Sequence, residues 1–181
     1  KDTPEEVATH PALFVTLTAP SFGKVHTQRR DSKGKIRPCH TSKSTKCIHG
    51  NEMQCTELHQ DGDDKIGQAL CSRCYDYETA VLCNAFSSEL WRRTRIQLDR
   101  ELAKQLRIPR NKLKDHLRLQ YVKVAEFQKR GAVHFHMVIR ADGPETNSDS
   151  PISIEELATA IDSACKPIKV RMPNGKRARW G

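Results

Sequence analysis

A chain of 181 residues, of which 36% are hydrophobic, is long enough for one domain with an apolar core of its own. Lys and Arg outnumber Asp and Glu by 31 to 22, and the net charge of +9 favours a polyanionic partner such as nucleic acid. The sequence has no apolar run long enough to cross a bilayer and no secretory signal pattern, so we expect a soluble cytoplasmic protein without a membrane partner.

Residues 13–18, LFVTLT, have the composition of a buried strand, and Pro20 limits its end. Alternation places the aliphatic residues on one side and the threonines on the other: Leu13, Val15 and Leu17 against Thr16 and Thr18. The threonines are either ordinary half-exposed strand residues or groups that meet phosphate and sugar oxygens of a nucleic acid.

Residues 21–38 are predicted to form a basic loop, which either is simply solvated or follows a nucleic-acid backbone. The basic residues of the loop are Lys24, Arg29, Arg30, Lys33, Lys35 and Arg37. We expect contact with nucleic acid here, and the residues assigned to it are Thr18, Lys24, His26, Arg29 and Arg30.

The segment from Cys39 to Cys74 contains five of the seven cysteines. Without a secretory signal, this clustering favours metal ligation over disulfides. Cys71 and Cys74 form a Cys-x-x-Cys knuckle, a spacing that lets two thiolates bind one zinc ion. The segment is polar and has little aliphatic material, so zinc would supply folding free energy on the order of 10 kcal/mol. The alternatives are reduced, unliganded thiols and a redox Cys-x-x-Cys motif.

More than four potential zinc ligands lie in this segment, which we expect to be an insertion over residues 39–75. Cys55 and His59 would stand one helical turn apart, and Cys39 and Cys47 remain as a further pair. The sequence allows one site with spare groups or two sites. The zinc candidates are Cys39, Cys47, Cys55, His59, Cys71 and Cys74.

A single long helix is predicted after the knuckle, with Asp76 as its N-cap and Pro109 limiting its end. Its apolar row, with support from Val81, Ala85 and Trp91, consists of Leu82, Phe86, Leu90, Thr94, Leu98, Leu102 and Leu106. The opposite, basic side is interpreted as solvated, with DNA contact as the alternative. Two further cysteines, Cys83 and Cys165, are interpreted as small core residues.

Residues 121–140 alternate apolar and polar side chains on both sides of a turn, which predicts a β-hairpin. A three-residue loop ending at Gly131 would place Glu126 opposite His134 and Val124 opposite His136. The residues expected to face the core are Tyr121, Ala125, Phe127, Val133, Phe135, Met137 and Ile139. A carboxylate and two imidazoles on the other face form a candidate divalent-metal site with free coordination positions. The alternative is that the two histidines simply face solvent, and a one-residue slip in register would separate the three groups.

The remaining chain contains a short predicted helix at 111–117 and a longer one at 154–166, which Ser153 and Glu156 would cap as a capping box. A strand is predicted at 168–172, followed by a turn at 173–175.

His134-Phe135-His136, with Glu126 eight residues before it, resembles the metal motif of the HUH endonucleases. Several segments taken together are similar to the RepSA-like replication initiators of actinobacterial integrative and conjugative elements and plasmids: FVTLTAPSFGKVH, LCSRCYDY, AVLCNAFSSELWRR and VAEFQKRGAVHFHMVIR. The resemblance covers most of residues 13–181.

The resemblance implies an α+β fold: a ferredoxin-like or RRM-like antiparallel sheet with helices on one face and a zinc-binding insertion, all in one nickase domain over residues 1–181. It also implies metal-dependent, strand-specific nicking of single-stranded or hairpin origin DNA for rolling-circle replication, with a host helicase or polymerase as possible further partners. Glu126, His134 and His136 would hold Mg²⁺ or Mn²⁺ at the scissile phosphate. A tyrosine would attack and leave a 5′-phosphotyrosine and a free 3′-OH.

The chain departs from this pattern because no tyrosine follows Tyr121. Tyr75 and Tyr77 lie at the knuckle, so the nucleophile is expected beyond Gly181. Two alternatives belong to other classes. One is a non-catalytic, zinc-stabilised DNA-binding module that recognises an origin or hairpin, and the other is a hydrolase with zinc at the same three residues.

Overall fold

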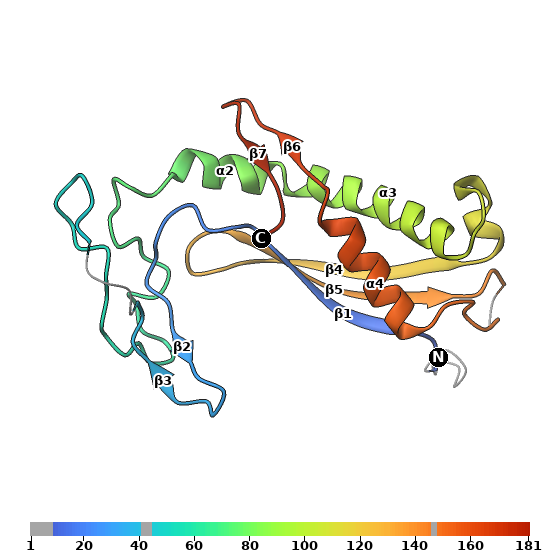
Figure 1. The fold of residues 1–181 in the computed structure, drawn as a ribbon, viewed down its shortest axis with the longest axis horizontal. Coiled ribbons are helices and arrows are strands. Elements are labelled where there is room, and N and C mark those ends of the chain that lie inside the picture. Colours follow the sequence, from blue (N-terminus) through green and yellow to red (C-terminus); the bar gives the residue numbers. More distant parts are fainter. Residues whose placement is uncertain (1–8, 41–44, 146–147) are drawn as a thin grey trace.

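The computed structural model describes residues 9–40, 45–145 and 148–181. Its centre is an antiparallel sheet of three strands in the order β1-β5-β4 (Figure 1). The strands are β1 (Ala12–Thr18), β4 (Arg118–Phe127) and β5 (Val133–Asp142). The two-residue strands are β2 (Arg29–Arg30), β3 (Ile36–Arg37), β6 (Val170–Arg171) and β7 (Arg177–Ala178), which form two small hairpins, β2-β3 and β6-β7. The mixed α+β architecture with antiparallel sheets agrees with the sequence-based prediction.

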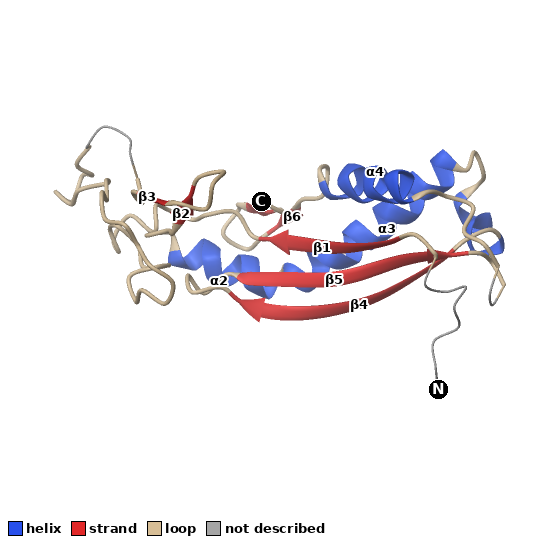
Figure 2. Ribbon diagram, turned by 90° about the horizontal axis from the view of Figure 1, so that it is seen from below, coloured by secondary structure: helices blue, strands red, loops and turns tan. Residues whose placement is uncertain are grey.

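The helices lie on one face of the central sheet (Figure 2). They are α2 (Tyr77–Ala85), α3 (Ser87–Gln105), the 3₁₀-helix η1 (Arg110–Asp115) and α4 (Ile154–Cys165). The predicted caps are confirmed. Asp76 accepts a hydrogen bond from the Thr79 amide at 3.1 Å, and Ser153 and Glu156 form the reciprocal capping box of α4. Within the described residues, no helix combines the length and apolar character needed to span a membrane.

The main core lies between the sheet and α3 and α4. The sheet contributes alternate residues of β1 and β5, and the helices contribute their buried stripes: Leu17, Phe135, Met137 and Ile139 against Leu98, Leu102, Leu157, Ala160 and Ile161. None of the described helices covers the opposite face of the sheet, and several apolar side chains there are exposed: Phe14, Val122, Val124 and Val138. One face of the sheet is therefore structural, and the other is open to a ligand.

The prediction of one continuous helix from residue 76 was wrong. Phe86, with φ −91° and ψ 3°, leaves the helical region and separates α2 from α3. At the break, Cys83 of α2 and Leu90 of α3 are buried in a second core with the β6-β7 hairpin, and the rest of α3 covers the sheet. Val81, which was expected to support the apolar row, is instead 66% exposed. Cys165 lies partly buried at the edge of the main core.

The prediction that Tyr121 points into the core was also wrong, since its side chain is 44% exposed. The reason is that β4 is an edge strand, so the helices cover only part of it. The ring packs edge-on against Trp91 with 5.2 Å between ring centroids. Phe127, at the end of the same strand, is 70% exposed for the same reason.

The described residues of 21–75 form a lobe at one end of the sheet, and the turn between β4 and β5 points toward it (Figure 1). The predicted basic loop at 21–38 contains the β2-β3 hairpin. At the other end of the chain, the strand predicted at 168–172 is reduced to β6 and pairs with β7, which the sequence did not predict.

Candidate functional site

The histidine hairpin has the predicted register. The Gln128 amide donates to the Ala132 carbonyl at 3.0 Å, so the loop is Lys129-Arg130-Gly131, and Gly131 adopts φ +74°. Glu126 lies opposite His134, and Val124 lies opposite His136. The two imidazoles and the carboxylate consequently lie on the open face of the sheet, which is the face that the helices do not cover.

The two threonines of β1 hold the imidazoles from the neighbouring strand. Thr18 Oγ1 lies 2.8 Å from His134 Nδ1, and Thr16 Oγ1 lies 3.3 Å from His136 Nδ1. A hydroxyl that accepts from Nδ1–H fixes the tautomer in which Nε2 is free to bind a metal. The threonines expected to meet nucleic acid thus contact the histidines themselves. Phe14 stacks on His136, with 5.4 Å between the ring centroids.

The geometry leaves Nε2 of His136 facing the carboxylate, 3.2 Å from Glu126 Oε2. The rings of His134 and His136 are 4.2 Å apart. Burial, followed by the nearby His136 ring, lowers the pKa of His134, so its imidazole is neutral at pH 7, the form that binds a metal. Within the described residues these three side chains do not form a group whose ligand atoms all lie within 4.8 Å of one another, and the Glu126 side chain is 64% exposed.

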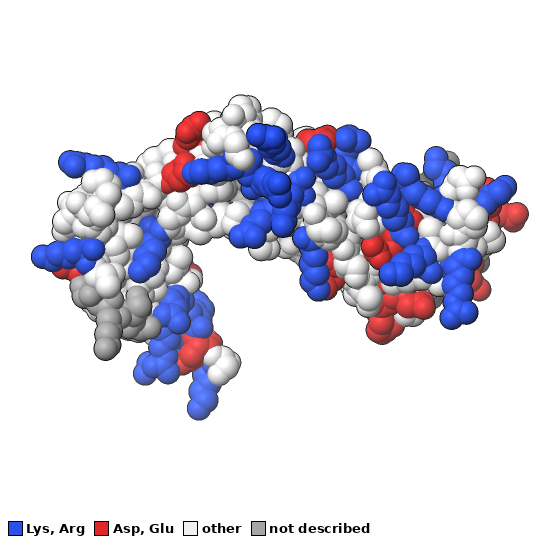
Figure 3. Space-filling view, turned by 45° about the horizontal axis from the view of Figure 1, so that its top comes forward, with Lys and Arg blue, Asp and Glu red and all other residues white. Residues whose placement is uncertain are grey.

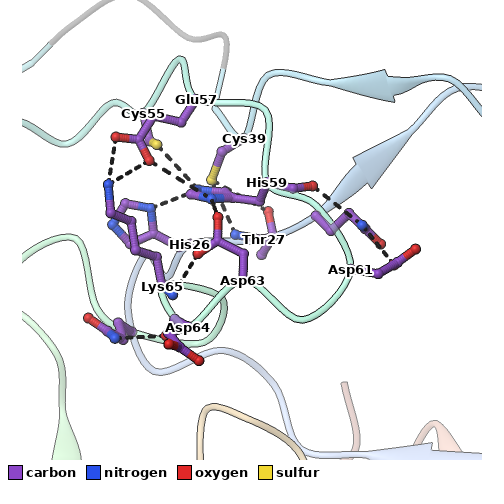
Figure 4. Close-up of polar contacts among 12 residues, drawn as sticks. His26, Thr27, Cys39, Cys55, Glu57, His59, Asp61, Asp63, Asp64 and Lys65 are labelled. Carbon is purple, nitrogen blue, oxygen red and sulfur yellow. Dashed lines mark hydrogen bonds and ion pairs between the residues drawn. The ribbon is translucent and has the colours of Figure 1, made fainter.

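Two other groups do meet that distance within the described residues, and both lie in the lobe. The first cluster consists of His26, Cys39, Cys55 and His59 (Figure 4). His59 Nε2 lies 3.1 Å from His26 Nδ1 and 3.5 Å from Cys55 Sγ. Donor atoms around one tetrahedral zinc ion stand about 3.3 to 3.8 Å apart, as follows from the Zn–N and Zn–S bond lengths. The first cluster therefore fits a zinc ion.

A carboxylate orients the buried imidazole of the first cluster. His59 is 1% exposed, and its Nδ1 lies 2.7 Å from the Asp63 carboxylate, as Figure 4 shows. This hydrogen bond is the largest cause that lowers the pKa of Asp63, so the carboxylate is ionised and accepts from Nδ1–H. The arrangement directs the Nε2 lone pair of His59 toward the other ligands, as carboxylate–histidine pairs do at zinc sites.

The second cluster consists of Cys47, His49, Cys71 and Cys74. His49 Nδ1 lies 3.2 Å from Cys74 Sγ and 3.7 Å from Cys71 Sγ. The side-chain amide of Asn51 donates to Cys71 Sγ at 3.0 Å and, as the largest cause, lowers the pKa of that thiol to about 6. Burial, as the largest cause, raises the pKa of the neighbouring Cys74 thiol to about 11, so the two thiols differ in their readiness to ionise. The spacing of the donor atoms is what fits a zinc ion at this cluster.

The ligand pairs of the lobe differ from the prediction. Cys39 and Cys47 do not pair but belong to different clusters, and Cys55 and His59 lie in irregular chain instead of a helical turn. His26 was predicted to contact nucleic acid, whereas it lies in the first cluster. His49 was not among the predicted zinc ligands. His49 follows Cys47 of the same cluster by two residues, so the Cys-x-His spacing was a signal that could have identified it. His26 lies outside the Cys39–Cys74 segment, and only chain folding brings it to the thiols.

The basic residues assigned to nucleic acid lie in or near the lobe, and several are already paired. Arg30 donates to the Asp61 carboxylate at 2.8 Å, and Lys24 donates to the Met53 carbonyl at 3.2 Å. Arg29 is exposed in β2. Figure 3 shows Lys and Arg side chains on both the lobe and the helical side, with acidic residues among them. The positive charge is therefore spread along the molecule rather than confined to β2-β3.

Comparison with known proteins adds an independent observation. The sequence profile of RepSA, described as the replication initiator protein of pSAM2, matches residues 1–181. A replication initiator protein of Streptomyces ambofaciens is 42% identical over 167 residues, which cover 91% of this chain and 32% of that protein. The chain thus spans about a third of the length of this relative. No solved structure matches the chain.

Proposed function

Because the chain belongs to the RepSA family of replication initiator proteins, we propose that it is the HUH-type nickase portion of such an initiator, which binds origin DNA and a divalent cation for strand-specific nicking. The observation that carries this proposal is the placement of His134, His136 and Glu126 on an uncovered sheet face, with a hydroxyl at Nδ1 of each histidine. Ferredoxin-like or RRM-like topology and the nicking reaction are parts of the same proposal.

The residues of the open face would have different roles in the proposed reaction. His134 and His136 would bind Mg²⁺ or Mn²⁺ through Nε2, and Glu126 would complete the set by a side-chain rotation. When bound, the cation supplies Lewis-acid stabilisation of the charge that develops on the scissile phosphate. Thr16 and Thr18 hold the imidazoles in the binding tautomer. Two or three ligands leave coordination positions for phosphate oxygens and water.

The attacking group of the proposed reaction is a tyrosine outside these 181 residues. Tyr121 lies on the opposite face of β4 from Glu126, because the two positions differ by an odd number of residues. Tyr75 is buried at the end of the lobe, where it packs with Val25 and Ala80, and Tyr77 lies beside it with 4.7 Å between the ring centroids. We assign the role to none of them. The matched relative is longer than this chain, which leaves room for such a residue in the whole protein.

The lobe would be a zinc-stabilised module with one ion in each cluster. Within the described part of residues 21–75 the chain has no helix and only the short β2 and β3, so backbone pairing and apolar burial contribute little to holding it. Two zinc ions would cross-link its loops and supply the missing free energy. Lys24 and Arg29 would approach the phosphates of the DNA from this module.

The experiment uses the full-length initiator with single-stranded DNA that carries its origin, in the presence of Mn²⁺. We expect a covalent protein–DNA adduct on a denaturing gel, and His136→Ala should abolish it. His116→Ala, at an exposed site after η1, is the matched control and should leave the adduct unchanged. An adduct that survives His136→Ala would contradict the proposed site.

A non-catalytic DNA-binding module is the second candidate. The observation that favours it is that the ligand atoms of the three residues on the open face do not all lie within 4.8 Å of one another, whereas those of each lobe cluster do. This candidate predicts DNA binding without any adduct, and binding that is unchanged when Glu126, His134 and His136 are all replaced. Electrophoretic mobility shift at two salt concentrations measures that binding.

A further inference from the structure

The lobe and the turn of the histidine hairpin are in direct backbone contact. Gly67 has φ +90°, and a Cβ at this position would lie 2.7 Å from Arg130 N and 2.7 Å from the carbonyl carbon of Lys129. Only glycine fits so close an approach to another backbone. The Lys129 ammonium also donates to the Asp63 carbonyl at 3.1 Å. The loop at 63–68 is therefore the surface on which this turn rests.

The same loop is tied to two ligands of the first cluster. The His26 amide donates to the Gln68 carbonyl at 2.8 Å, and the Gly67 amide donates to the His26 carbonyl at 2.8 Å. Asp63, at the start of the loop, accepts the Nδ1–H of His59 at 2.7 Å. A metal ion that fixes His26 and His59 consequently fixes both ends of the loop.

From the turn, a second set of contacts leads to the open face. The Arg130 guanidinium donates to the Gln128 side chain at 2.8 Å and to the Ala19 carbonyl at 2.7 Å, just beyond Thr18. The side-chain nitrogen Nε2 of Gln128 lies 3.4 Å from His134 Nδ1. The turn thus touches both the strand end that carries Thr18 and the side of the imidazole that Thr18 holds.

From these contacts we propose that the first cluster positions the histidine hairpin, so that metal in the lobe sets the divalent-cation affinity of the open face. Gly67, Lys129 and Arg130 are the positioning residues of this link. The inference rests on the proposed function, because it assigns cation binding to His134 and His136. The physical reason is that metal ligands tolerate little displacement, and loss of an outer partner typically weakens metal binding 10-fold to 100-fold.

The test compares two glycine substitutions in the full-length protein. Gly67→Ala adds a methyl group against the turn, whereas Gly62→Ala, at φ +86° just before the loop, adds it where nothing lies within 4 Å. Both variants carry the strain of a positive φ, so their difference isolates the contact. Mn²⁺ affinity is measured by electron paramagnetic resonance, zinc content by mass spectrometry, and hydrogen exchange over residues 128–134.

We expect Gly67→Ala to retain zinc, to bind Mn²⁺ on the order of tenfold more weakly than Gly62→Ala, and to exchange amides of the turn faster. Lys129→Met, a surface change that removes only the Asp63 contact, should shift both readouts in the same direction and keeps the test decisive if Gly67→Ala does not fold. Suppose that Mn²⁺ binding by the parent requires His136, but all variants show the same Mn²⁺ affinity and the same hydrogen exchange as the parent. That result would overturn this inference and leave the proposed function standing. A parent that binds no Mn²⁺ at this site would overturn the proposed function and the inference with it.

Discussion

Replacing Thr18 with valine tests whether the β1 hydroxyls hold the metal-binding tautomer of the histidines. Valine has nearly the same shape, so the change removes the partner of His134 Nδ1, 2.8 Å away, without opening a cavity. A neutral hydrogen bond contributes about 0.5 to 1.5 kcal/mol net, and 1.4 kcal/mol corresponds to a factor of ten. We therefore expect Thr18→Val to weaken Mn²⁺ binding by about twofold to tenfold.

Thr16→Val is the graded control on the same strand. Its hydroxyl lies 3.3 Å from His136 Nδ1 at a more exposed position, so the loss of Mn²⁺ affinity should be smaller, about twofold or less. Isothermal titration with Mn²⁺ measures the affinities, and thermal unfolding verifies that both variants keep the parent's stability. Our reasoning would be refuted if Thr18→Val bound Mn²⁺ as tightly as the parent while His134→Ala lost binding.

Three further predictions concern stability and zinc. Asp76→Ala should lower the free energy of unfolding by about 1 kcal/mol, the usual effect of losing an N-cap. The Lys176 ammonium, as the largest cause, lowers the pKa of Asp76 to about 2. The stabilisation by the ionised carboxylate is therefore fully present above about pH 4 and fades as the pH falls toward 2. Urea unfolding at a series of pH values should show this loss of stability in the parent but not in Asp76→Ala. Leu102→Ala, at a side chain with 0% exposure, should destabilise the protein by about 2 to 5 kcal/mol, measured by the same unfolding. Asp63→Asn should weaken zinc at the first cluster on the order of tenfold in competition with a chromophoric chelator, and Asp61→Asn, which touches no ligand of the cluster, should not.

The hairpin shows why some of this protein can be predicted locally. Alternation from Tyr121 to Arg140 and a glycine at position 131 fix the register, because a three-residue loop needs positive φ at its last residue. The same holds for the caps at Asp76 and Ser153, where the side chain bonds an amide three residues away. In each case the interacting groups are near neighbours in the sequence.

The helix and edge-strand errors have a different cause. The i+4 row through Phe86 is compatible with one helix, and the second core at the break combines Cys83 and Leu90 with residues of the β6-β7 hairpin far along the chain. Tyr121 alternates correctly with its neighbours but lies on an edge strand, which no periodicity reveals. The degree of burial depends on which element lies above a residue.

The sequence by itself determined the register of the histidine hairpin, the face that carries Glu126, His134 and His136, and the presence of a Cys/His segment suited to zinc, because those features depend on period and short spacing. Only the tertiary structure decided how the ligands divide into two clusters, that His26 joins the first, and that the lobe rests on the hairpin turn through Gly67. These depend on loops without periodic structure, whose closure brings together groups separated by tens of residues. Short-range sequence patterns do not predict contacts between residues so far apart in the chain.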